Sequence, residues 1–134
     1  MTYIGVKKTD YQAEDRSWIL SQWGLGPGEN PSIVLDISAF TKATHYPNGY
    51  IKSGEPLGKI TATGLYGPYD NAAADGREVG AGFLHSATVV PDMSDTTKDV
   101  GAALVKAGFI KESNLPRAID AGFRTDLKLC DFTA

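Results

Sequence analysis

The segment GYIKSGEPLGKI at residues 49–60 decides between a nucleotide-binding loop and a bent pair of β-strands. A phosphate-binding loop requires four residues between its glycines, followed by Lys and then Ser or Thr. Here three residues separate Gly54 from Gly58, and Ile60 occupies the position of the required hydroxyl residue. Pro56 also lacks the backbone N–H that a phosphate cradle needs. The apolar residues on either side of the glycines therefore predict two short strands joined by a turn.

The residues around this segment continue the pattern of short β-strands. The sequence IVLDI at residues 33–37 and the stretches near residues 50–63 and 79–90 are rich in Val, Ile, Thr and aromatic residues, and glycine or proline interrupts them. β-branched and aromatic residues favour strands, and Gly and Pro mark the turns between them. The sequence therefore predicts a mainly β fold, a compact barrel or sandwich.

One segment departs from this pattern and predicts a short helix at about residues 95–107. Within SDTTKDVGAALVKAG, the apolar residues Val100, Ala103 and Leu104 recur at spacings of three and four, as they do on one face of a helix. Gly108 follows at the position where helices commonly end. We therefore expect one helix in an otherwise β-rich chain.

The composition limits the kinds of partner. A chain of 134 residues usually makes one domain. It carries 13 basic and 16 acidic residues, a formal net charge of −3, which does not favour nucleic acid or an anionic membrane. No apolar stretch approaches the roughly 18 residues that span a bilayer, and the N-terminal residues lack the apolar core of a signal peptide. We expect a protein of a soluble compartment, with neither nucleic-acid nor membrane partners.

The sequence offers no pattern typical of a catalytic or metal site. Nucleophilic catalysis needs a base, but His45 lies in a turn-rich stretch and is expected at the surface, while His85 is expected to be a hydrogen-bonded structural residue of a strand. The loop DNAAADGRE at residues 70–78 has alanines where a calcium loop needs oxygen ligands. Cys130 is the only cysteine and is expected to be a small buried side chain.

We therefore expect no catalytic residue, no metal and no cofactor. A glycosidase-type pair of carboxylates stays open at this point, because any two of the 16 acidic residues can converge in a fold.

Residues 1–31 predict an N-terminal arm with a Gly/Pro linker, ahead of a β-rich domain at residues 32–134. The arm holds large apolar side chains and ends in GLGPGENP. Ordering about fifteen residues on a partner costs roughly 1 kcal/mol of conformational entropy per residue. Burial of about 600 Å² of apolar surface, at ~25 cal/mol per Å², offsets this cost. A lone Trp more often folds back on its own domain, but Trp18 and Trp23 together favour a partner. We expect the arm to add a strand to the exposed sheet edge of another molecule.

Several segments in order carry a resemblance to a known family. The run IVLDISAFTKATHYPNGYIKSGEPLGKITATGLYGPYD is followed by DGREVGAGFL and then by GAALVKAGFIKESNLP. With DRSWIL at residues 15–20, these segments resemble the head decoration proteins of tailed bacteriophages, similar in type to the lambda capsid-stabilising protein. The likeness covers nearly the whole chain and rests on the order and spacing of the segments.

The resemblance implies a domain of the β-tulip type that assembles as a homotrimer at the threefold and quasi-threefold positions of the capsid. N-terminal arms would reach onto the major capsid protein, and the family pattern carries no metal or cofactor. Such a protein is made in the host cytoplasm and stabilises the outer surface of the expanded virion head against internal DNA pressure. The implied capsid-binding arm comprises Tyr11, Asp15, Arg16, Trp18, Ile19, Leu20 and Trp23, and the possible trimer or surface contacts are Tyr66 and Tyr69.

Two other functions remain open from the sequence. A carrier domain of the biotinyl or lipoyl kind has short strands with glycine turns, but Lys52 and Lys59 lack the flanking residues of a modified lysine. A carbohydrate-binding or host-surface adhesion module would stack sugar rings on aromatic side chains. The segment GLYGPYD at residues 64–70 is the best candidate for that role.

Overall fold

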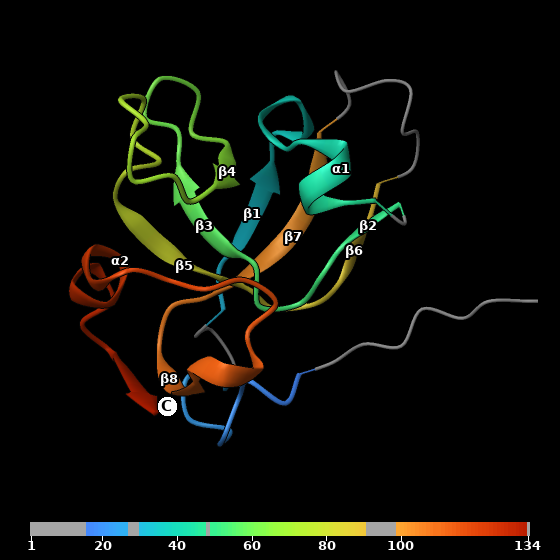
Figure 1. Ribbon diagram of the computed structural model, residues 1–134. Helices are drawn as coiled ribbons and strands as arrows, with labels where there is room; N and C mark the ends of the chain where they lie inside the picture. Colours follow the sequence, from blue (N-terminus) through green and yellow to red (C-terminus); the bar gives the residue numbers. More distant parts are fainter. Residues whose placement is uncertain (1–15, 27–29, 48, 91–98, 134) are drawn as a thin grey trace, which may run out of the picture.

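A closed five-stranded barrel forms the centre of the molecule (Figure 1). The computed structural model describes residues 16–26, 30–47, 49–90 and 99–133. The barrel strands follow one another in the order β1-β4-β3-β5-β7, and their bounds are β1 Ser32–Leu35, β4 Tyr66–Pro68, β3 Pro56–Lys59, β5 Gly80–Leu84 and β7 Val100–Val105. The predicted mainly β class is therefore confirmed.

Antiparallel pairing dominates the barrel. β1 pairs with β7 over its whole length, from Ser32 opposite Ala103 to Leu35 opposite Val100, and this pairing closes the barrel. β1 also pairs in parallel with β4, at Leu35 and Tyr66. β3 lies between β4 and β5 and is antiparallel to both. Closure leaves these short strands with partners on both sides, which removes the exposed edges of an open sheet.

Within the described residues, two small sheets and four short helices are attached to the barrel (Figure 1). β2 (Tyr50–Ile51) pairs with β6 (Thr88–Val89), and β8 (Gly108–Lys111) pairs in parallel with β9 (Cys130–Thr133). The α-helices are α1 (Lys42–His45) and α2 (Ala121–Asp126), and the 3-10 helices are η1 (Ile37–Ala39) and η2 (Glu112–Asn114). Asp120 caps α2, since its carboxylate accepts a hydrogen bond from the Phe123 amide at 2.8 Å.

The opening segment forms the two strands that its composition predicts. β2 ends at Ile51, β3 begins at Pro56, and Gly54 between them has a φ of +90°, which a residue with a side chain rarely adopts. The two strands do not pair with each other, because β2 pairs with β6 while β3 enters the barrel. A Cβ at Gly58 would lie 2.7 Å from the Arg77 backbone, so this glycine permits close packing of two chain segments.

The predicted helix at about residues 95–107 is wrong for the residues that the structure describes. Residues 100–105 form β7, and residues 95–98 lie outside the described part of the chain. β7 fills the gap between β1 and β5, where both of its sides find hydrogen-bonding partners. This pairing overrides the helical propensity of the local sequence, because the tertiary context decides the state of a short, alanine-rich segment.

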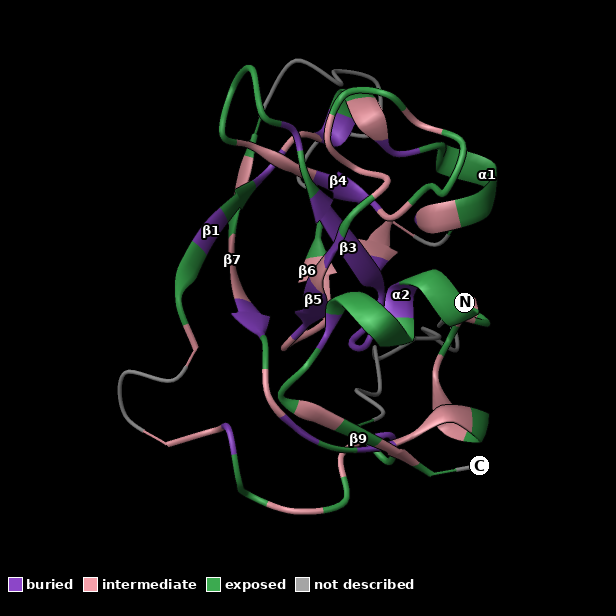
Figure 2. Ribbon diagram, turned by 90° about the vertical axis from the view of Figure 1, so that its left-hand side faces the viewer, coloured by how far each residue is buried: buried purple, intermediate pink, exposed green. Residues whose placement is uncertain are grey.

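The wall made by β5 and β7 separates two core clusters. Phe83 lies opposite Val105 and Leu84 lies opposite Leu104. Since neighbouring residues of a strand point to opposite faces, Leu84 and Leu104 join the first cluster, while Phe83 and Val105 join the second. Figure 2 shows buried residues along β3 and β5 and on the side of α2 that faces them.

The two clusters differ in the elements that build them. The first fills the barrel and the space under α1, and its buried members are Ile33, Leu35, Ile37, Phe40, Tyr46, Ile51, Leu57, Leu84, Val90 and Leu104. The second lies between the barrel wall, β8 and α2, and its buried members are Trp18, Phe83, Val105, Ile110, Phe123 and Leu127.

Candidate functional site

The described part of the predicted arm packs along β8. Ile19 forms an antiparallel bridge with Ile110, the Leu20 amide donates to the Phe109 carbonyl at 3.0 Å, and the Lys111 amide donates to the Trp18 carbonyl at 2.8 Å. The expectation that this segment adds a strand to another molecule is therefore wrong for residues 18–20, which form one isolated bridge with β8 of the same chain. Tyr11 and Asp15, which the sequence also assigned to the arm, lie outside the described residues.

Trp18 belongs to the protein's own core, and the prediction that it binds another molecule from an arm without a core is wrong. Its side chain is 0% exposed, its ring lies 5.2 Å from the ring of Phe83, and its indole N–H donates to the Ser53 hydroxyl at 3.2 Å. The physical reason is that the second core cluster offers Trp18 an apolar site within its own chain. Phe83 of the barrel wall and Ile110 of β8 present apolar surface to the space between them, and Trp18 covers it.

Trp23 differs from Trp18 and forms an exposed apolar patch with two neighbours. The exposed fractions are 52% for Trp23, 50% for Leu20 and 41% for Phe109, and the rings of Trp23 and Phe109 lie 5.8 Å apart. We call these three residues the Trp23 patch. The backbone beneath it packs closely against Ala107, because a Cβ at Gly24 would lie 2.1 Å from the Ala107 carbonyl oxygen.

The remaining arm residues have more ordinary surroundings. Ile19 is half-buried against the second cluster. The exposed Arg16 donates from its guanidinium to the Ser86 hydroxyl at 2.8 Å. The sequence therefore identified the exposed residues Leu20 and Trp23, but it could not distinguish them from the buried Trp18 in the same short segment.

Tyr66 and Tyr69 lie in different surroundings, although the sequence grouped them as surface contacts. The Tyr69 hydroxyl donates to the Asp120 carboxylate at 2.9 Å, and its ring packs edge-on against Phe123 at 4.8 Å. Burial and the neighbouring Asp120 raise the pKa of Tyr69 to about 12. Tyr69 therefore holds α2 against the barrel, whereas Tyr66 is half-buried and lines a groove on the barrel surface.

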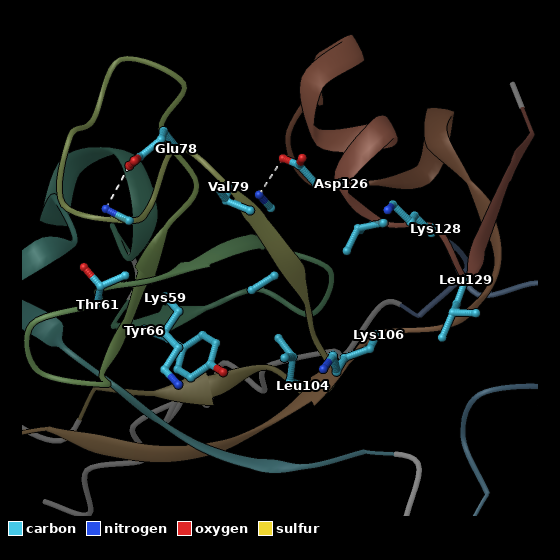
Figure 3. Close-up of a pocket in the computed structure, with 14 residues that line it drawn as sticks. Lys59, Thr61, Tyr66, Glu78, Val79, Leu104, Lys106, Asp126, Lys128 and Leu129 are labelled. Atoms are coloured by element: carbon cyan, nitrogen blue, oxygen red, sulfur yellow. Dashed lines mark hydrogen bonds between the residues drawn. The ribbon is translucent and has the colours of Figure 1, made fainter.

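This groove, of about 720 Å³, opens beside the first residues of β5 (Figure 3). Tyr66, Ala81 and Leu104 line its base, and all three belong to the first cluster or pack against it. The exposed lysines around it are Lys59, Lys106 and Lys128. We call it the basic groove. Sequence reasoning missed it, because its residues come from several segments that share no motif.

The two carboxylates of the groove are engaged by backbone amides. Glu78 accepts a hydrogen bond from the Gly76 amide at 2.8 Å, and Asp126 accepts one from the Gly80 amide, also at 2.8 Å (Figure 3). Within the described residues, none of the three groove lysines forms a salt bridge. The groove therefore presents three ammonium groups that have no acidic neighbour bound to them in the described part of the chain.

A partly buried charged cluster lies near α1. Glu55 is 2% exposed and accepts a hydrogen bond from the Arg117 guanidinium at 2.8 Å. His45 lies 3.9 Å from the same carboxylate oxygen, and its Nδ1 accepts a hydrogen bond from the Thr41 amide. Burial raises the pKa of Glu55, and burial followed by the Arg117 charge lowers the pKa of His45. The prediction that His45 is a surface residue is wrong, because its side chain is only 12% exposed.

The other reactive residue types have structural surroundings. His85 follows β5, where its amide donates to the Ala103 carbonyl and its Nδ1 lies 3.0 Å from the Ser86 hydroxyl. Cys130 is half-buried, and its thiol donates to the Lys106 carbonyl at 3.4 Å. Burial raises the pKa of the Cys130 thiol to about 11, which opposes formation of the reactive thiolate.

The described residues contain no group of His, Cys, Asp or Glu side chains placed to hold a metal ion. None of the helices formed by these residues has the length and apolar character that a membrane crossing requires. No protein-family model matches the chain, and no curated protein matches it either.

Proposed function

We propose that this protein is a capsid decoration protein without enzymatic activity. It binds the outer surface of an expanded phage head through the major capsid protein, as homotrimers at the threefold and quasi-threefold positions, and stabilises the shell against internal DNA pressure. The resemblance of the ordered sequence segments supports this proposal. The closed barrel is compatible with the β-tulip, which we propose as its finer class.

The observation that carries the proposal is the Trp23 patch. Three large apolar side chains stand exposed side by side, two of them on residues 16–26 and one on β8. Large exposed apolar patches mark interaction sites, and aromatic anchors dominate the energetics of interfaces. Residues 16–26 are also the segment that continues into residues 1–15. We propose that residues 1–15 reach onto the major capsid protein and that the Trp23 patch packs against it.

The size of the patch favours a trimer. A fully buried aromatic side chain contributes about 150–250 Å², so the half-exposed residues leave on the order of 250 Å² to bury, or about 6 kcal/mol at ~25 cal/mol per Å². Association alone costs an estimated 4–15 kcal/mol. One patch is therefore a weak anchor, and three patches carried by one trimer gain from their high effective concentration.

Sedimentation with capsid shells tests the proposal. The wild-type protein is mixed with expanded and with unexpanded shells, and we expect it to sediment with the expanded shells. Trp23→Ser should weaken this binding at least tenfold. Val89→Ser is the matched control, since Val89 is 57% exposed but lies on β6. Wild-type protein that sediments with neither shell contradicts the proposal, and equal binding by both variants contradicts the role of the patch.

One observation favours a second candidate, a carbohydrate-binding or host-surface adhesion module displayed on the virion. The exposed Trp23 ring beside Phe109 has the aromatic character of a sugar-stacking platform. Tyr69 does not suit that role, because its ring and hydroxyl are already engaged by Phe123 and Asp120. Binding on a glycan array that Trp23→Ser abolishes would support this second function.

A further inference from the structure

The basic groove exists because β5 and β7 separate. Only Phe83 and Leu84 of β5 pair with β7, whereas Gly80 and Gly82 pair with β3 on the other side. α2 contacts β5 at its start, where the Gly80 amide donates to the Asp126 carboxylate at 2.8 Å, and farther along, where the Phe123 ring packs 5.2 Å from the Phe83 ring. A groove of about 720 Å³ is left between these elements.

The groove combines an apolar base with a positively charged rim. Its base includes the buried Leu104. Two exposed apolar residues also line the groove, Val79 with an exposed fraction of 55% and Leu129 with 62%. Figure 3 shows Lys59 at one end of the groove and Lys106 and Lys128 toward the other. The groove lining carries three lysines and two carboxylates, Glu78 and Asp126, a formal charge of 3 − 2 = +1, whereas the whole chain carries −3. The lysines form no salt bridge among the described residues, whereas the carboxylates already accept backbone hydrogen bonds, so the groove favours an acidic partner.

The groove and the Trp23 patch are neighbours. Lys106 lies on the rim of the groove, and Phe109 of the patch follows it by three residues. The Gly108 amide between them donates to the Leu129 carbonyl of the groove wall, and a Cβ at Gly108 would lie 3.1 Å from the Trp23 carbonyl oxygen. A partner that covers the patch is therefore adjacent to the groove.

Resting on the proposed function, we propose that the basic groove is a second contact with the capsid shell. It binds an acidic segment of the major capsid protein, which inserts an apolar side chain over Leu104 while its carboxylates meet Lys59, Lys106 and Lys128. The Trp23 patch supplies apolar area, and the groove supplies the charge complementarity that sets orientation and salt dependence.

Charge reversal tests the proposal in the full-length protein. Lys106→Glu/Lys128→Glu should weaken binding to expanded shells at least tenfold in 50 mM salt, and the loss should shrink in 500 mM salt because salt screens exposed charges. The matched control is Lys42→Glu/Lys52→Glu, which makes the same charge change at exposed positions beside α1 and β2. All four lysines are exposed, but the Lys52 charge also lowers the pKa of the buried Glu55. The melting temperature of each variant is therefore measured first, and binding is compared at a temperature at which both are folded.

Lysine acetylation followed by mass spectrometry gives a second readout. In shell-bound protein, Lys59, Lys106 and Lys128 should be protected relative to free protein, while Lys42 and Lys52 stay reactive. If the protein binds shells but the groove lysines stay fully reactive, the groove proposal is overturned and the decoration function is left intact. The same conclusion follows if the groove variant binds shells with unchanged affinity. Absence of any shell binding overturns both. Protection of the groove in free, self-associated protein also overturns the proposal, because the occupant is then a second copy of the chain.

Discussion

At the scale of single residues, the two tryptophans have opposite roles. Trp18 is 0% exposed and packs on Phe83, whereas Trp23 is 52% exposed. Trp18→Ala should lower the free energy of unfolding by about 3–5 kcal/mol, the usual cost of truncating a large buried aromatic residue. Trp23→Ala should lower it by less than about 1 kcal/mol. Urea unfolding followed by circular dichroism measures both, and equal losses would contradict the burial of Trp18.

Glu55 is the residue whose protonation should affect stability most clearly. Burial raises its pKa above the ordinary value of 4.5, while Arg117 opposes that rise. The folded protein therefore keeps a proton on Glu55 at a pH where the unfolded chain has lost it. Stability from this group is present at low pH and is lost as the pH rises from the unfolded pKa through the folded pKa.

Arg117→Gln should extend this loss to higher pH. Without the guanidinium, the pKa of Glu55 rises further, and the pKa of His45, which Arg117 lowers, rises as well. Both changes favour the folded state at low pH relative to high pH. We expect a destabilisation of about 1–3 kcal/mol at pH 7, as for a buried group that loses its partner, and a smaller one at pH 4. Urea unfolding between pH 4 and pH 7 measures this difference in stability. The double variant Glu55→Gln/Arg117→Gln should lack the part of the pH dependence that comes from Glu55.

At the scale of secondary structure, the pairing of β5 with β7 holds the two core clusters apart. A Cβ at Gly82 would lie 2.4 Å from the Val105 carbonyl oxygen, so Gly82→Ala should push the strands apart and cost about 1–3 kcal/mol. Gly101→Ala on β7 is the matched control. Its Cβ would meet nothing within 4 Å, and the lower entropy of the unfolded chain should stabilise the protein by about 0.4–1 kcal/mol. Thermal unfolding that ranks the variants in the reverse order would contradict this pairing.

The strand β7 also explains why its sequence was misleading. Leu104 and Val105 are adjacent and both buried, because each faces a different core cluster. Alternation between an apolar and a polar face, the usual signal of a strand, is therefore absent, and the remaining spacing resembles a helix. The second cluster, which Val105 faces, joins residues from distant segments of the chain, so no local pattern reveals it.

The candidate site could be predicted only in part, because its residues are brought together by tertiary packing. The turn chemistry at Gly54 and the strands around it depend on local residue types, and these predictions were confirmed. Trp18 and Trp23 have the same type and similar neighbours, so only tertiary packing distinguishes them. The basic groove joins lysines from β3, β7 and the residues after α2, and no local pattern connects them.

At the scale of the whole molecule, the burial of Trp18 changes how the N-terminal region must be tested. Deletion of residues 1–24 removes Trp18 from the second cluster, so it should destabilise the domain by at least about 3 kcal/mol. Deletion of residues 1–15 leaves every contact of Trp18 given above in place. We expect the shorter deletion to keep the folded circular dichroism spectrum and to weaken shell binding at least tenfold. Unchanged binding after the shorter deletion would contradict the proposed reach of residues 1–15.

The proposed mechanical role makes its own prediction for the assembled shell. A ligand that prefers the expanded shell shifts the shell toward that state in proportion to its differential binding. DNA-filled shells decorated with the wild-type protein should therefore release DNA at a higher temperature, and survive chelation longer, than undecorated shells. A fluorescent dye that reports free DNA during heating measures this.

The Trp23→Ser variant should protect such shells only at higher protein concentration. In the proposed trimer, three patches would bind one shell together, so weakening each patch would lower the combined affinity by more than a single contact does. At saturating concentration, however, the variant should restore protection, because Trp23→Ser weakens one contact and leaves the fold of the barrel unchanged. Equal DNA release from decorated and undecorated shells contradicts the stabilising role even if binding itself is observed, since an adhesion module displayed on the virion would bind without strengthening it.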